Sequence, residues 1–335
     1  MNSIERLMRV INFKTPDRVP VVAQVFGHAA IVSKVSLHDY IRDGELLASC
    51  QINALKRYKY DAVFALMDVL VETEAIGSVL EYRRDQYPIC KKYVLSETTN
   101  PDLLLMPDPY QAKRMPELLK AADILRAQLG DEILIVGCVI GPMTLTGQLL
   151  GAERALNLAI DEPEKFSRIL NFSKKVAIKF GLAQIEAGVH LPIVFEPFGS
   201  PAVVPHQFFR EFILPHLKEI FSTFKKTGAA SNWLHIAGHT GSILSYYPEI
   251  GVDIANFDYY VNPLVAQKLL PRICLDGNIK SLSFIEATPA EILKESQKLL
   301  DLFAERGGYI LSSGCEIPPE SNPKNVEAMV SATKL

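Results

Sequence analysis

Three residues with different donor atoms stand where apolar segments of the chain end. Glu196 closes the segment LPIVFE, His235 ends a strand-like segment that runs into the Gly-rich turn of WLHIAGHTGS, and Cys315 follows GYILSSG. A carboxylate at the end of a buried strand is costly unless it is paired or binds metal. A free cysteine on a polar, proline-stiffened loop is unusual, because free cysteines prefer the core. Oxygen, nitrogen and sulfur donors together suit tetrahedral zinc with one open position, so these residues predict a catalytic zinc site.

Two of the three residues also have an ordinary structural interpretation. Glu196 could pair with a nearby Arg or Lys, and backbone groups could satisfy His235 at its strand end. The spacing of the three matches no short zinc motif. His239 is not counted as a ligand, because Gly238 and Gly241 argue against a helical face that it would share with His235.

A repeated pattern of strand and helix must position these residues. Apolar or β-branched segments typical of buried parallel strands recur at 18–26, 61–67, 132–139, 191–196, 230–236, 252–257, 272–277 and 308–314. Amphipathic helical patterns lie between them, as at 164–186, 205–226 and 289–306. The pattern predicts an α/β fold, one (β/α)8 TIM barrel over residues 1–335, with a doubly wound open sheet as the alternative. The polar stretch within 73–106 predicts a small hairpin insertion after strand two.

Active sites of such barrels lie at the carboxyl ends of the strands, which brings further residues into the prediction. The candidates for substrate or cofactor contacts, by position alone, are His28, Asp68, Phe198, Asp258 and Asn278. Phe26, Tyr259 and Tyr260 could supply aromatic walls or simply pack at the rim.

The composition limits the classes of protein that fit. With 48% hydrophobic and 22% charged residues in 335, the chain can bury a large core and is not expected to be disordered. A net charge of −3 gives no electrostatic reason to expect nucleic acid or a membrane surface as partner. The N-terminus has no apolar core of signal-peptide length, and no segment is long enough to span a bilayer. The five cysteines are scattered, without a CxxC pair, so we expect a cytoplasmic protein without a disulfide framework.

Several longer segments carry a resemblance to a known family. They are ERLMRVINFKTPDRVPV, IGPMTLTGQLLG, EPFGSPAVVPHQFFREFILPHLKEI, WLHIAGHTGSIL, LDGNIK and GYILSSGCEIPPESNPKNVEAMV, of which the last two are the most specific. Through them the sequence resembles the uroporphyrinogen decarboxylase superfamily over nearly its whole length, and more closely its corrinoid methyltransferase branch. That branch includes zinc enzymes that move methyl groups between a substrate and a separate cobalamin-carrying protein. The resemblance therefore implies a zinc-dependent methyltransferase with a corrinoid protein as partner.

One position departs from the family's pattern. In thiol-methylating members the zinc ligands come from a His-x-Cys pair after strand five and a cysteine after strand eight. His235 and Cys315 match two of these, but Ala237 stands at the place of the middle cysteine. This departure either abolishes zinc binding or shifts ligation to another group, for which Glu196 is the best-placed substitute. A carboxylate in place of a thiolate makes zinc a harder Lewis acid, better suited to polarising an oxygen atom. The resulting hypothesis is O-demethylation, in which a methyl ether, aromatic above all, gives its methyl group to cob(I)alamin on a partner corrinoid protein.

Three other functions remain open. A methylcobalamin-dependent thiol or tetrahydrofolate methyltransferase would run the transfer toward the small molecule, although the missing thiolate argues against the thiol version. A uroporphyrinogen decarboxylase resembles the chain less, because the family's arginine-rich segment after strand one reads AQVFGHAAIVSKVS here. A metal-free module that binds a corrinoid or tetrapyrrole is the third alternative.

Overall fold

Eight parallel strands form one sheet in the computed structural model, which describes residues 1–334. The order around the sheet is β1 (Val21–Val22), β10 (Tyr309–Ser313), β9 (Cys274–Ile279), β8 (Ile254–Asn256), β7 (Trp233–His235), β6 (Leu191–Phe195), β5 (Leu134–Ile140) and β2 (Ala62–Phe64). β1 and β2, at the two ends of this order, meet through a hydrogen bond of 2.8 Å from the Asp61 backbone N–H to the Val21 carbonyl. This contact completes the predicted (β/α)8 barrel.

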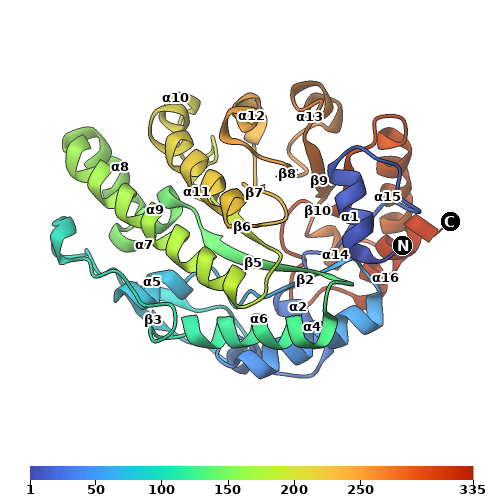
Figure 1. Cartoon of the computed structure of the whole chain (residues 1–335), viewed down its shortest axis with the longest axis horizontal. Coiled ribbons are helices and arrows are strands. Elements are labelled where there is room, and N and C mark those ends of the chain that lie inside the picture. Colours follow the sequence, from blue (N-terminus) through green and yellow to red (C-terminus); the bar gives the residue numbers. More distant parts are fainter. Residues whose placement is uncertain (335) are drawn as a thin grey trace.

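Helices surround the barrel (Figure 1). Their bounds are α1 Ser3–Ile11, α2 Gly27–Val32, α3 Leu37–Tyr40, α4 Gly44–Tyr58, α5 Val71–Ile76, α6 Met115–Leu129, α7 Pro142–Leu150, α8 Ala152–Asp161, α9 Pro163–Glu186, α10 His206–Phe208, α11 Leu214–Lys226, α12 Tyr247–Ile250, α13 Pro263–Leu269, α14 Ser283–Glu286, α15 Pro289–Phe303 and α16 Pro323–Ser331. With helices outside the sheet and side chains filling its interior, strands such as β5 are buried along their whole length, as a parallel sheet covered on both faces requires. Within residues 1–334, no helix has the length and apolarity to cross a membrane.

The predicted helical patterns agree with the structure at two places and differ at a third. α9 follows the pattern at 164–186, and α15 begins with the capping box of Thr288 and Glu291. The pattern at 205–226 is divided into α10, a π-helical turn at Phe209–Ile213 and α11. Pro215 explains the irregular turn, because it has no N–H to donate to the carbonyl four residues earlier.

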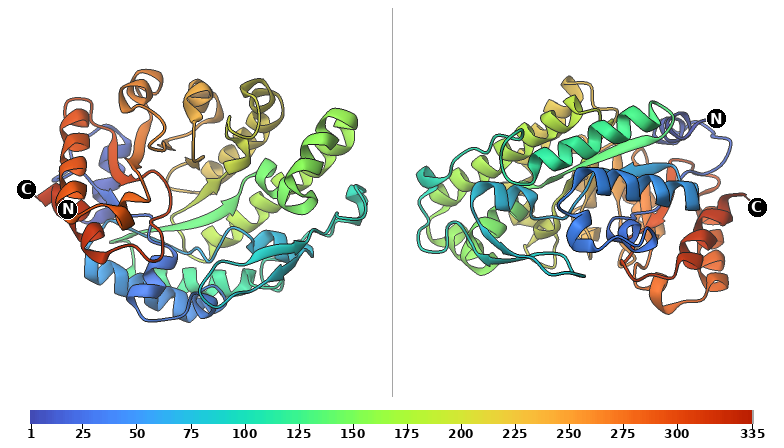
Figure 2. Two further views of the ribbon diagram at one scale, coloured as in Figure 1. Left: turned by 180° about the vertical axis from the view of Figure 1, so that it is seen from behind. Right: turned by 90° about the horizontal axis from the view of Figure 1, so that it is seen from below.

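The hairpin insertion is also confirmed. β3 (Val79–Glu81) and β4 (Ile89–Lys92) pair antiparallel after β2, outside the barrel sheet. The hairpin lies on the side of the molecule opposite both chain termini (Figure 2). The residues that join its two strands reach back to the barrel, where Tyr87 and Pro88 line a cavity.

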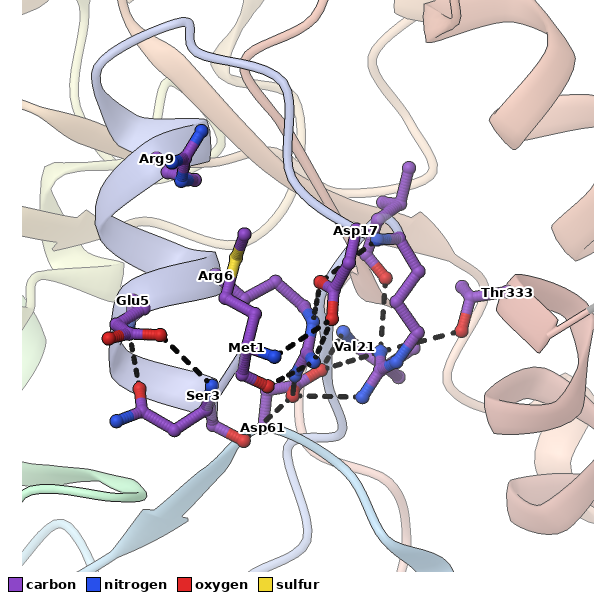
Figure 3. A network of polar contacts seen from close by, with 12 residues as sticks. Met1, Ser3, Glu5, Arg6, Arg9, Asp17, Val21, Asp61 and Thr333 are labelled. Atoms are coloured by element: carbon purple, nitrogen blue, oxygen red, sulfur yellow. Dashed lines mark hydrogen bonds and ion pairs between the residues drawn. The ribbon is translucent and has the colours of Figure 1, made fainter.

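A buried carboxylate holds the barrel together where β1 meets β2 (Figure 3). Asp61 is fully buried and accepts hydrogen bonds from the guanidinium groups of Arg6 (2.6 Å) and Arg18 (2.8 Å). It also accepts from the Ser3 hydroxyl and the Val21 backbone N–H, both at 2.8 Å. Two cations and two neutral donors thus compensate the burial of this charge, and they fix α1 and β1 to β2.

Candidate active site

A cavity of about 210 Å³ lies at the carboxyl ends of the barrel strands. The residues that line it are Phe26, Leu66, Met67, Asp68, Val69, Leu70, Tyr87, Pro88, Phe195, Pro197, His235, Ala237, Cys315 and Glu316. Most of these side chains are apolar or aromatic. The polar ones follow β2 and β10, end β7, or come from the hairpin. This is the place at which (β/α)8 enzymes hold their substrates.

His235, the last residue of β7, is buried, and only one of its two ring nitrogens forms a hydrogen bond within residues 1–334. Its Nε2 donates to Oε1 of Gln24 over 3.0 Å. The Gln24 amide nitrogen donates in turn to the Ser313 carbonyl at 3.0 Å, which leaves its oxygen for the imidazole. Burial lowers the pKa of His235 to about 3, so the ring is neutral at pH 7. Among the described residues 1–334, Nδ1 has no hydrogen-bond partner, so it keeps a free lone pair.

Cys315 lines the same cavity from the loop after β10. Burial raises the pKa of its thiol to about 12, and the nearby carboxylates of Glu316 and Asp258 act in the same direction. The group is therefore a thiol at neutral pH, and only a bound cation or metal would make it a thiolate. The structure thus brings together two of the three predicted ligands.

Glu196 lies apart from this pair and is not among the residues that line the cavity. Its carboxylate accepts hydrogen bonds from the backbone N–H groups of Met143 (2.9 Å) and Thr144 (2.7 Å), and from the Thr144 hydroxyl. These groups form the N-terminus of α7, where a negative charge is favourable. The approach is close, since a Cβ on Gly141 would stand 2.4 Å from Oε2 of Glu196. Burial raises the pKa of Glu196 to about 7.

The predicted zinc ligands do not fit a catalytic zinc ion as they are placed. Within residues 1–334, no three His, Cys, Asp or Glu side chains come together as a group that could hold a metal. His235 has a free nitrogen and Cys315 a sulfur at the same cavity, but Glu196 has both oxygens engaged by α7. Ala237, which also lines the cavity, offers no donor. Catalytic zinc sites have three protein ligands, and only two are available here.

Asp68, among the predicted binding residues, lines the cavity. Its carboxylate forms an ion pair with Arg114 and accepts from the Leu70 backbone N–H at 2.8 Å. Arg114 is itself buried and also pairs with Glu74 at 2.7 Å. The charge of Asp68 is therefore balanced inside the protein.

Two predicted binding residues pack into the protein rather than line the cavity. The two ring nitrogens of His28 lie 2.9 Å from the Pro319 carbonyl and 2.8 Å from the Tyr58 hydroxyl. Both nitrogens are thus satisfied, and the residue is fully buried. The Phe198 ring packs against α7, where a Cβ on Gly147 would stand only 2.3 Å from it.

Asp258 and Asn278 shape the loops beside the cavity. The Asp258 carboxylate accepts from the backbone N–H groups of Gly238 (2.7 Å) and Tyr259 (2.6 Å), and burial raises its pKa. The Asn278 amide donates to the carbonyls of Val261 (3.1 Å) and Asp258 (3.3 Å). Neither side chain lines the cavity, so their geometry shows loop-forming contacts.

Sequence reasoning missed three polar residues at the site, Gln24, Tyr87 and Glu316. Glu316 accepts hydrogen bonds through Oε1 from the Tyr87 hydroxyl (2.5 Å) and the Gly27 backbone N–H (3.3 Å). Its position directly after Cys315 was a usable signal. Tyr87 gave none, because the hairpin folds back onto the barrel only through tertiary contacts.

The fold and the cavity define a (β/α)8 barrel with a binding site of enzyme type at its carboxyl end. Residues 2–335 match the family described as uroporphyrinogen decarboxylase (URO-D), and the chain belongs to this family. The expected family resemblance is thereby confirmed.

Relatives with known activities fall into two groups. The chain is 26% identical to the methylcobamide:CoM methyltransferase MtaA of Methanosarcina barkeri, over 98% of this chain and 96% of that protein. It is 24% identical to a uroporphyrinogen decarboxylase of Magnetococcus marinus, over 88% and 83% of the two chains. A solved methyltransferase from Methanosarcina mazei superposes with a TM-score of 0.91 at 22% identity, covering 100% of this chain and 98% of that one. This last likeness confirms the barrel fold.

Proposed function

We propose that this chain is a methyltransferase that moves a methyl group from a methyl ether to cob(I)alamin on a partner corrinoid protein. The observation that carries the proposal is that His235 and Cys315 line one largely apolar cavity at the barrel mouth. These are the two positions that match the family's zinc-ligand pattern. The methylcobamide-dependent activity named for several relatives supports a corrinoid as the second reactant.

The walls of the cavity support an uncharged, flat methyl donor. Phe26 and Phe195 line it, and their ring centroids are 6.1 Å apart in an edge-to-face arrangement. Such walls suit an aromatic ring that buries its faces. No Lys or Arg is among the lining residues, so the carboxylates of a porphyrinogen, or the sulfonate of an acceptor such as coenzyme M, would meet no counter-ion. This favours the ether over the decarboxylase and thiol alternatives.

The proposed step breaks one bond and forms one. The electron pair of Co(I) attacks the methyl carbon, the carbon–oxygen bond breaks, and its electrons go to the leaving oxygen, which takes up a proton from water. The chain's own part is to bury the ring and to hold the methyl group toward the open end, where the corrinoid arrives. Positioning of this kind is a large contribution to rate. Because His235 and Cys315 are the only predicted zinc ligands that line the cavity, no part of the step is assigned to zinc.

The test is a methyl-transfer assay with cob(I)alamin, in which the visible absorption spectrum of the corrinoid reports the formation of methylcobalamin. Methoxyarenes, methanol and methylamines are offered side by side, with and without the purified chain. The proposal expects methylcobalamin to form with methoxyarenes only, and at least about tenfold more slowly with the Phe195→Ala variant, which removes a cavity wall. Transfer only from a methylamine or a thioether would contradict the ether as donor.

A further inference from the structure

The charged residues that line the cavity are all acidic. Two carboxylates, those of Asp68 and Glu316, are among the lining residues, and no lysine or arginine is. The charge of Asp68 is balanced by Arg114, which lies behind it and is engaged with Asp68, Glu74 and the Ile41 carbonyl. Arg114 is therefore not free to receive a ligand's charge. What remains facing a guest is Glu316.

Glu316 has hydrogen bonds but no cation. Within the part of the chain that the structure describes, it forms no ion pair, and its Oε1 accepts from the Tyr87 hydroxyl at 2.5 Å and from the Gly27 backbone N–H at 3.3 Å. Both partners donate, so they favour the carboxylate as an acceptor. Gly27 follows β1, Tyr87 comes from the hairpin and Glu316 follows β10. Three separate segments thus hold the group at the cavity wall.

In its ionised form, a carboxylate held in place without a counter-ion discriminates among guests by charge. A second anion brought beside it would be repelled, and the apolar surroundings weaken the screening by water. An uncharged guest of the same shape meets no such penalty. We propose that Glu316 is a specificity-determining residue that excludes anionic ligands from the cavity, so that the methyl donor is an ether without carboxylate, sulfonate or phosphate groups. That the guest is a methyl donor rests on the proposed function, whereas the exclusion of anions concerns binding alone.

The experiment compares two ligands of nearly equal size that differ in charge. Isothermal titration calorimetry at pH 8 measures the binding of 3-methoxybenzyl alcohol and of 3-methoxybenzoate to the full chain without corrinoid. The alcohol should bind at least about tenfold more tightly than the benzoate. In the Glu316→Gln variant, which keeps an acceptor oxygen for Tyr87 and Gly27, the benzoate should gain affinity relative to the alcohol. Glu320→Gln, an exposed carboxylate on the same loop, should leave the ratio unchanged.

Three results would overturn the inference. They are equal or tighter binding of the benzoate to the natural chain, a ratio that does not move in Glu316→Gln, and no binding of either ligand. The first and third results are measured on the natural chain. The inference can therefore be tested even if the Glu316→Gln variant fails to fold. Binding that obeys the charge rule without methyl transfer to cob(I)alamin would contradict the proposed function and leave the charge rule standing.

Discussion

The imidazole Nε2 of His235 donates a hydrogen bond of 3.0 Å to the side chain of Gln24. Gln24 lies just after β1, and His235 is the last residue of β7. The Gln24 amide is oriented by the Ser313 carbonyl, so the bond assigns the ring proton to Nε2 and leaves Nδ1 bare. Hydrogen bonds to the second ring nitrogen set the tautomer of functional histidines in this way. Nδ1 is therefore the ring nitrogen of His235 that is left without a hydrogen-bond partner among residues 1–334.

Replacing Gln24 by Leu should disturb this tautomer. Without the acceptor, the Nε2 proton has no buried partner, and both tautomers become populated. Nitrogen-15 NMR of labelled histidine should show Nε2–H and bare Nδ1 in the natural chain and a mixed signal in the Gln24→Leu variant. Gln111→Leu, at an exposed position, is the matched control. A natural chain with its proton on Nδ1 would refute the assignment.

A cysteine at position 237 should strengthen zinc binding, because residues 1–334 bring no three His, Cys, Asp or Glu side chains together as a metal-binding group. Ala237 lines the cavity with His235 and Cys315, so Ala237→Cys would add a third donor of the kind zinc prefers. We expect zinc affinity, measured by equilibrium dialysis, to rise by at least about tenfold. Ala202→Cys, outside the cavity lining, serves as the control for a stray thiol. An unchanged affinity would mean that the three positions do not converge.

Glu196 should matter for stability through α7. Glu196→Ala leaves two backbone N–H groups and the Thr144 hydroxyl without their acceptor. The free energy of unfolding, from urea titration, should fall by about 3 kcal/mol. Glu164→Ala, an exposed residue in the first turn of α9, should change it by less than about 0.5 kcal/mol. If Glu196→Ala kept its stability but lost bound zinc, the carboxylate would be a ligand, as first expected from the sequence.

Asp276 should make stability depend on pH. It is fully buried in β9, bonded to the Asn256 amide at 3.1 Å, and burial raises its pKa to about 7 from 3.8. The folded chain thus holds this proton more tightly than the unfolded chain, and the stability present below about pH 4 is lost as the pH rises to about 7. Relative to Asp276→Asn, the natural chain should lose on the order of a few kcal/mol between pH 4 and pH 8 in urea titrations. A difference between the two proteins that stays constant with pH would contradict this.

The barrel could be predicted from the sequence because its signals are local. Apolar segments, helical periodicity and caps such as Thr288 lie within a few residues of the elements they define. The hairpin followed from its polar composition. Strand lengths could not be predicted, since β1 was expected over 18–26 and spans only Val21–Val22. Its pairing depends on β10 and β2, which are remote in the chain.

The sequence predicted which residues lie at the strand ends better than it predicted which way their side chains point. His235 ends its strand, Cys315 and Asp68 come soon after theirs, and all three line the cavity as expected. The reasoning that a buried carboxylate needs partners also holds for Glu196, but the partners are the N–H groups of α7. Which way a side chain points at a strand end depends on the neighbouring loop and helix. The same limitation hid Glu316 and Tyr87.

Transfer of a labelled methyl group tests the central claim most directly. The chain and cob(I)alamin are incubated with 3-methoxybenzyl alcohol that carries a trideuteromethyl ether, and the corrinoid is examined by mass spectrometry. The account predicts trideuteromethyl-cobalamin and an equal amount of 3-hydroxybenzyl alcohol, neither of which forms without the chain. The proposed function would be contradicted if the corrinoid stayed unlabelled and the ether stayed intact while, under the same conditions, the chain transferred the methyl group of methylcobalamin to a thiol.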